Sequence, residues 1–213
     1  MSDDLLREIL REANKGDLFR KILTQARVSK TLVQIYANPQ NLEQSHVGFV
    51  RSLGEETVLL QELTCEGEPD GTTAFGIRQI LEIAQNTRKL RRVQLLHERG
   101  LHLIGGGDAG ISEESEDCVE DELQRALEAE EIVSLRVTTD HDYSQVGGFV
   151  QYVGDGYVQV ELITTVGEPD GLATLRITDV SCVMRNDRQH RAAMQYYKHR
   201  EELYGPRGAD KQA

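Results

Sequence analysis

Apolar residues recur at two spacings along the chain, and the spacings change in the same order twice. At 5–13 and 18–23, leucines and isoleucines lie three and four positions apart, which predicts helices. Apolar runs at 31–37, 47–53 and 57–63 follow, bounded by polar or glycine-containing segments, and predict strands. A Gly-Glu-Pro-Asp-Gly turn, a short strand and a final apolar pair come next, before a closing helix at about 86–99. The first half therefore predicts helix, strands and closing helix.

The second half repeats the first at an offset of 100 residues. Residues 48–80 and 148–180 align without a gap and are identical at 12 of 33 positions. The identities include Gly-Phe-Val at 48–50 and 148–150, and Gly-Glu-Pro-Asp-Gly at 67–71 and 167–171. The second copy accordingly predicts a helix at 120–129, a strand at 131–137 and a closing helix at about 186–204. It also contains Gly154-Asp155-Gly156, which is typical of a tight hairpin between two strands. Self-similarity at a fixed offset indicates a tandem duplication.

The duplication predicts two domains and a linker. We expect residues 1–104 to form the first module with its flanking helices, and residues 119–205 the second module with its closing helix. Residues 105–118 are rich in glycine and acidic side chains, which is typical of a flexible linker. Residues 206–213 are expected to be a flexible tail.

Composition indicates a cytoplasmic globular protein. The chain is 28% charged and 38% hydrophobic, and it has no apolar run near the length of a membrane span. Its three cysteines form neither a disulfide framework nor a metal-ligand spacing, which fits a reducing compartment. The net charge of -12 disfavours a non-specific coat on nucleic acid.

The order of elements in each copy resembles the Sm-like family, which includes the Sm and LSm proteins and the Hfq-type bacterial RNA chaperone. The carriers in the first copy are the apolar run at 33–36, Gly-Phe-Val at 48–50, Val-Leu-Leu at 58–60, and Ile80 with Ile83. The resemblance implies a mainly β fold with helices (α+β). We expect two tandem Sm-like or SH3-like five-stranded barrels, each with an N-terminal helix and a closing C-terminal helix.

The resemblance implies self-association more strongly than it implies RNA binding. The Asp and Asn of the family's first RNA-reading motif would fall on Gly54 and Val58, and on Gly154 and Val158. The Arg of the second motif is matched only by Arg176. Outer strands of such modules pair with the next module, so we expect the chain to bind itself, as a pseudo-ring within one chain, a dimer or a ring of six modules.

The closing helices are the basic part of an acidic chain. Both begin with the same Asn-x-Arg-x-x-Arg sequence, and each helical stretch carries a net charge of +4. Such side chains can grip a nucleic-acid backbone, or they can pair with acidic surface of the same protein or of a partner. The candidate contact residues are Arg88, Arg91, Arg92, Arg176, Arg188 and Arg191.

No group of residues in the sequence predicts catalysis, a cofactor or a metal. The carboxylates of each Gly-Glu-Pro-Asp-Gly turn are too few for a calcium site. Asp140, His141 and Asp142 are adjacent on an extended segment, so their side chains diverge. We therefore expect a non-enzymatic, self-associating scaffold or interaction protein. The alternatives are an RNA-binding protein that uses the basic closing helices and, third, an enzyme with an interface site.

Overall fold

The computed structural model describes residues 18–38, 41, 44–100, 117–138, 143–164 and 167–204. The chain divides into two compact units, Met1–Val119 (unit 1) and Glu120–Ala213 (unit 2). Four predictions fall outside the described residues: the helix at 5–13, most of the linker, the Asp-His-Asp segment at 140–142 and the tail at 206–213.

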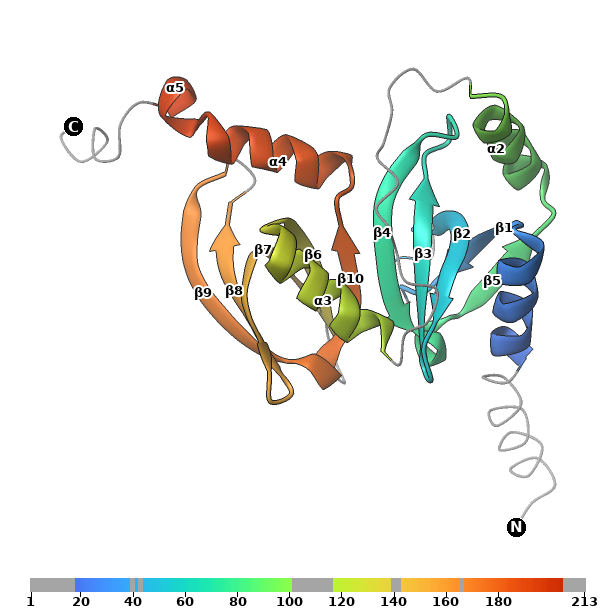
Figure 1. Cartoon of the computed structure of the whole chain (residues 1–213), viewed down its shortest axis with the longest axis horizontal. Coiled ribbons are helices and arrows are strands. Elements are labelled where there is room, and N and C mark those ends of the chain that lie inside the picture. Colours follow the sequence, from blue (N-terminus) through green and yellow to red (C-terminus); the bar gives the residue numbers. More distant parts are fainter. Residues whose placement is uncertain are drawn as a thin grey trace, which may run out of the picture. The chain divides into compact units, whose positions relative to one another are not determined.

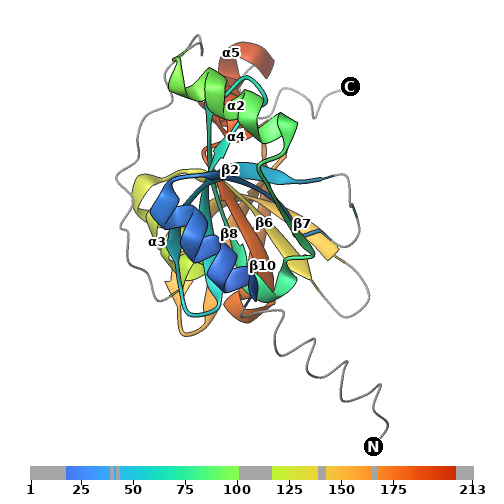
Figure 2. The same ribbon diagram turned by 90° about the vertical axis from the view of Figure 1, so that its right-hand side faces the viewer.

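Unit 1 is a helix followed by five antiparallel strands and a second helix (Figures 1 and 2). After the helix at 18–29 come β1 (Leu32–Tyr36), β2 (His46–Leu53), β3 (Thr57–Leu63), β4 (Pro69–Gly76), the 3-10 turn η1 (Ile77–Gln79), β5 (Glu82–Gln85) and α2 (Arg88–Glu98). The strand order is β5-β1-β2-β3-β4. Both views show α2 lying across one end of this sheet.

Unit 2 has the same order of elements. Helix α3 (Cys118–Ala129) starts on the last two residues of unit 1. It is followed by β6 (Ile132–Thr138), β7 (Tyr143–Gly154), β8 (Tyr157–Ile163), β9 (Pro169–Arg176), η2 (Ile177–Asp179), β10 (Val180–Arg185), α4 (Arg188–Lys198) and α5 (Arg200–Tyr204). The strand order β10-β6-β7-β8-β9 reproduces that of unit 1, element for element.

The predicted α+β class is confirmed, but the prediction of two closed five-stranded barrels is wrong. In each unit the two strands at the ends of the order, β5 and β4 or β10 and β9, do not pair with each other, so each described sheet is open. Register shifts at Val50/Ser52 and Val150/Tyr152 bend the long second strand of each sheet. A bent sheet closes into a barrel only when hydrogen bonds join its first and last strands, and without them it stays a curled open sheet.

Two turns differ in how well their sequences predicted them. Asp155 and Gly156 both have positive φ, as the expected tight hairpin between β7 and β8 requires. The Gly-Glu-Pro-Asp-Gly sequence is only partly a turn, because Pro69 already begins β4. The turn lies earlier, where the Thr64 backbone N–H donates to the Glu68 carbonyl. Proline is tolerated as the first residue of a strand, since it lacks only a backbone donor.

The apolar residues of the strands form the core of each unit. Val58 and Leu60 in unit 1, and Val158 and Val160 in unit 2, are completely buried. On the other face of the unit 1 sheet, α2 adds Leu90 and Val93 to a cluster formed by strand residues Leu32, Val47 and Leu63. Burial of this helix face fixes α2 against the sheet, and it exposes the opposite, basic face of the helix to solvent.

Candidate binding surfaces

Each unit has a cleft at the same place, between the end of its first helix, its second strand and its closing helix. The cleft in unit 1 has a volume of about 550 Å³. It is lined by Arg27, Val28, Lys30, Phe49, Val50, Arg51, Gln94, His97 and Glu98. The cleft in unit 2, of about 650 Å³, is lined by residues that include 127, 130, 149–151, 194, 197 and 198, each at the 100-residue offset. The site is thus duplicated with the fold.

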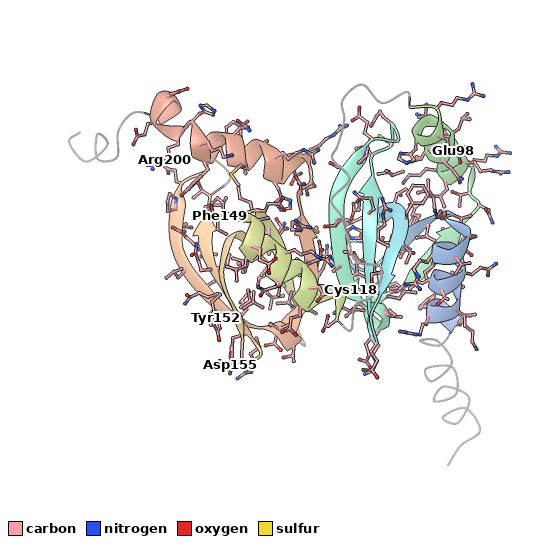
Figure 3. The ribbon with its side chains drawn as sticks, viewed as in Figure 1. Glu98, Cys118, Phe149, Tyr152, Asp155 and Arg200 are labelled. Carbon is pink, nitrogen blue, oxygen red and sulfur yellow. The ribbon has the colours of Figure 1, made fainter. Side chains whose placement is uncertain are left out.

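An aromatic pair forms the same part of both clefts. The Phe49 and His97 rings lie 5.4 Å apart between centroids, and the Phe149 and Tyr197 rings 4.9 Å apart. The turn before β4 packs against this helix position, since a Cβ on Gly67 would lie 2.6 Å from the His97 backbone nitrogen. Figure 3 shows Phe149 toward α4, and Tyr152 and Asp155 toward the opposite end of the unit.

The two clefts carry opposite charge. Arg27, Lys30 and Arg51 face one acid, Glu98, in unit 1. At the first three of these positions unit 2 has Leu127, Glu130 and Gln151. Its cleft is lined by the acids Glu130, Glu131 and Glu161 and by the bases Arg191 and Lys198. The difference extends beyond the cleft, because residues 18–100 carry a net charge of +2 and residues 118–200 carry -6.

The predicted contact arginines lie on separate surfaces. Arg88, Arg91 and Arg92 are exposed on α2, and Arg188 and Arg191 are exposed on α4. Of these, Arg191 lines the unit 2 cleft. Arg176 is exposed at the end of β9, where it pairs in register with Tyr157. It is not among the residues that line either described cleft.

The capping residue of α4 lies beside the unit 2 cleft. The Asp187 side chain accepts from the His190 backbone N–H at 2.8 Å, and the His190 side chain reaches back in a capping box. Burial raises the pKa of Asp187, but the hydrogen bonds and charge of His190 outweigh it, so its pKa lies below the usual value. His190 also contacts the Ser134 hydroxyl at 2.9 Å, which joins the start of α4 to β6.

Each unit contains a buried polar cluster whose residues are not repeated in its counterpart. In unit 1, His46 Nδ1 lies 2.6 Å from Glu62 Oε1, and Thr73 donates to the same oxygen. The matching residues of unit 2 are Val146, Leu162 and Ala173. In unit 2, Arg185 lies between Glu122 and Glu131, and the matching residues of unit 1 are Gln85, Ile22 and Thr31. The shared fold therefore requires neither cluster.

One sheet face is buried in unit 1, at Ser52 and Thr72, and exposed at the matching positions of unit 2. The backbone N–H of Cys118 donates to Thr57 Oγ1 at 2.8 Å, and Cys118 is buried. At the offset of 100, Thr57 corresponds to Tyr157, which is 44% exposed. Tyr152 and Leu172, on the neighbouring strands, are 45% and 64% exposed. Unit 2 thus exposes two tyrosines and a leucine on a face that also carries Arg176 and, in register with Leu172, Glu161. We call it the β9 face (Tyr152, Tyr157, Leu172 and Arg176).

Outer strands have a pairing partner on one side only within their unit. Among the described strands, β5 pairs with β1 alone and β9 pairs with β8 alone. Glu82 of β5 and Arg176 of β9 are both exposed. An outer strand offers backbone donors and acceptors in a row, and it can extend another sheet by pairing.

Sequence reasoning missed the cleft residues Arg27, Lys30 and Arg51. They belong to two segments that also look like ordinary solvated surface, so the sequence of one copy gives no reason to group them. A comparison of the two copies at the offset of 100 would have identified these positions. Two of the three cations are replaced by neutral residues in the second copy, and the third is replaced by an acid.

Among the described residues, no three histidine, cysteine or acidic side chains are grouped so that they could hold a metal ion. No helix in the same part of the chain is long and apolar enough to cross a membrane. No protein-family model matches the chain, and no curated protein or solved structure matches it.

Proposed function

We propose that the chain is a non-enzymatic scaffold that associates with copies of itself, head to tail, through two Sm-like modules. The order of helix and five strands on which the family resemblance rests is present in both units, which supports the Sm-like assignment. The observation that carries the proposal is the pair of outer strands. Among the described residues of their units, strand β9 pairs with β8 alone and strand β5 pairs with β1 alone, so β9 of one copy can pair with β5 of the next.

One pair of opposite charges lies on the two outer strands, although β9 also carries the exposed Asp170. Strand β9 ends in exposed Arg176, and β5 begins with exposed Glu82. In an antiparallel pair, the end of one strand lies opposite the beginning of the other. A register that places Arg176 opposite Glu82 is favoured over the alternatives by the attraction between the two charges. The exposed Leu172 on β9 would lose contact with water in the same association.

The β9 face supplies a second contact for the same partner. In unit 1 the backbone N–H of Cys118, at the start of α3, donates to Thr57 at the position that matches Tyr157. The residue that matches Cys118 in the first copy is Leu18, which is 57% exposed at the start of the helix at 18–29. In the proposed assembly, Leu18 of a second copy packs on Tyr157 as Cys118 packs on Thr57.

The test is the oligomeric state in solution. Light scattering coupled to gel filtration is expected to give a mass above that of one chain, and Leu172→Lys is expected to lower it. The matched control is Val28→Lys, which adds the same charge at an apolar residue that is 76% exposed but lies on neither the outer strands nor the β9 face. A chain that stays monomeric at all accessible concentrations contradicts the proposal.

A second candidate function is RNA binding through α2. The exposed Arg88, Arg91 and Arg92 favour it, since they lie on the more basic of the two copies. Affinity for a single-stranded RNA is then expected to fall steeply with salt and to fall further when these three residues are changed to alanine. Arg188→Ala with Arg191→Ala on α4 serves as the control. RNA that does not bind even at low salt contradicts this function.

A further inference from the structure

We propose that the cleft of unit 1 is a binding site for a short acidic peptide segment that carries an apolar side chain, supplied by a partner protein. This site is separate from the outer strands and the β9 face that carry the proposed self-association. It is assembled from three elements of unit 1: the end of the helix at 18–29, strand β2 and helix α2.

The charge of the cleft selects an anion. Arg27 and Lys30 come from the end of the helix, and Arg51 comes from β2. Lys30 and Arg51 are exposed and Arg27 is half-buried, so all three can reach a ligand at the mouth of the cleft. Glu98 is the single acid among the nine lining residues. Cations from separate elements around one cleft raise the local concentration of a negatively charged ligand.

The end of the helix at 18–29 does not require a cation at Lys30. Positive side chains are favoured near the end of a helix, which could account for Lys30. However, Glu130 occupies the same position in unit 2, with φ of 51° against 50° for Lys30. A helix that ends in the same geometry with an acid shows that the fold does not require a cation here. The charge of the unit 1 cleft therefore calls for a separate explanation.

Apolar surface lies among the cations and selects the rest of the ligand. Val28 is 76% exposed on the rim, and half-buried Phe49 and buried Val50 line the cleft with it. An isolated exposed valine is ordinary on a protein surface, but here it adjoins a concave site of about 550 Å³. A ligand with carboxylates and one apolar side chain complements both parts of the lining.

The aromatic pair favours a peptide over nucleic acid. Single-stranded nucleic acid is usually held by aromatic rings whose faces are open for stacking with bases. Phe49 already packs on His97, at 5.4 Å and 53°, and on the buried cluster beneath α2. Its ring is thus a wall of the cleft and not a stacking platform. A short acidic peptide also carries fewer charges than a nucleic acid into the field of a chain with a net charge of -12.

The experiment uses the full chain and a fluorescein-labelled probe peptide in which glutamates flank a central leucine and phenylalanine. Fluorescence anisotropy at low salt is expected to show binding. The variant Arg27→Leu, Lys30→Glu, Arg51→Gln imports the unit 2 residues at the same positions. It is expected to weaken binding by about threefold to a hundredfold, because three exposed charge pairs are lost and each contributes only a modest factor to affinity. A circular dichroism melt checks that the variant folds.

Three controls make the result specific. A probe with lysines in place of the glutamates should not bind to this cleft, and Arg88→Ala with Arg92→Ala on the outer part of α2 should leave peptide affinity unchanged. The reciprocal change Leu127→Arg, Glu130→Lys, Gln151→Arg in unit 2 is expected to raise the stoichiometry measured by calorimetry from one peptide to two. Leu172→Lys should bind the peptide normally, which separates this site from self-association.

Three outcomes would overturn the proposal. The first is absence of peptide binding at low salt. The second is equal affinity of the natural chain and the triple variant in unit 1. The third is a single-stranded RNA that binds more tightly than the peptide and loses its affinity in the same triple variant, which would assign the cleft to nucleic acid.

Discussion

Removal of the Arg185 side chain should destabilise unit 2 far more than an ordinary polar substitution. Arg185 Nε lies 3.1 Å from Glu122 Oε2, and its NH1 lies 2.5 Å from Glu131 Oε2. Burial lowers the pKa of the Arg185 guanidinium, but the two carboxylates outweigh it, so the pKa is raised and the group stays charged. The Glu122 side chain is fully buried, and Arg125 is a further salt-bridge partner of it, at 2.7 Å.

The size of the effect follows from this burial. Arg185→Gln introduces the residue of unit 1, and it removes the cation while Glu122 stays in the interior. Removing one partner of a buried pair costs about 3–5 kcal/mol, because the other charge stays desolvated, and Arg125 should keep the loss at the lower end. The double variant Arg185→Gln with Glu122→Ile matches unit 1 at both positions and should recover most of the loss.

The assay is urea unfolding followed by circular dichroism, with hydrogen exchange of the unit 2 strands to assign the change to that unit. The free energy of unfolding at zero urea is obtained by linear extrapolation. The reasoning is refuted if Arg185→Gln lowers it by less than about 1 kcal/mol, the range of an exposed pair. It is also refuted if the double variant is as unstable as the single one.

Three further predictions concern stability. Glu62→Leu alone should lower the free energy of unfolding by about 1–3 kcal/mol, because buried His46 loses its partner, and adding His46→Val should restore part of it in the same urea assay. Asp187→Ala should cost about 1 kcal/mol at neutral pH. The pKa of Asp187 is lower in the folded chain than its unfolded value, near 3.8. The stabilisation by the Asp187 carboxylate is therefore complete above the unfolded pKa and is lost as the pH falls through the folded pKa. In acid, the melting temperature of Asp187→Ala should approach that of the natural chain. Gly48→Ala should cost about 1–3 kcal/mol, since its Cβ would lie 2.1 Å from the Gln61 carbonyl oxygen, whereas Gly76→Ala, with nothing nearer than 3.6 Å, should melt almost normally.

The sequence predicted elements well where their patterns were local. Apolar runs bounded by polar or glycine-containing segments marked β2 and β3, and the Asp155-Gly156 dipeptide marked a hairpin, because both depend on neighbours in the chain. The openness of the sheets could not be predicted, since it depends on whether strands distant in sequence, such as β4 and β5, meet. The polar clusters were hidden for the same reason. His46 and Glu62 read as the polar positions of two half-exposed strands, yet they face each other inside the unit.

The unequal charge of the copies has a consequence for any array that they build. Residues 18–100 are net basic and residues 118–200 are net acidic, although their folds correspond element for element. If β9 of one chain joins β5 of the next, every such junction brings an acidic module beside a basic one. The array would then be polar along its length, with an electrostatic period of one chain, or two modules. A partner that recognises one sign of charge would bind at every second module. The duplication would then set the distance between bound partners as well as their number.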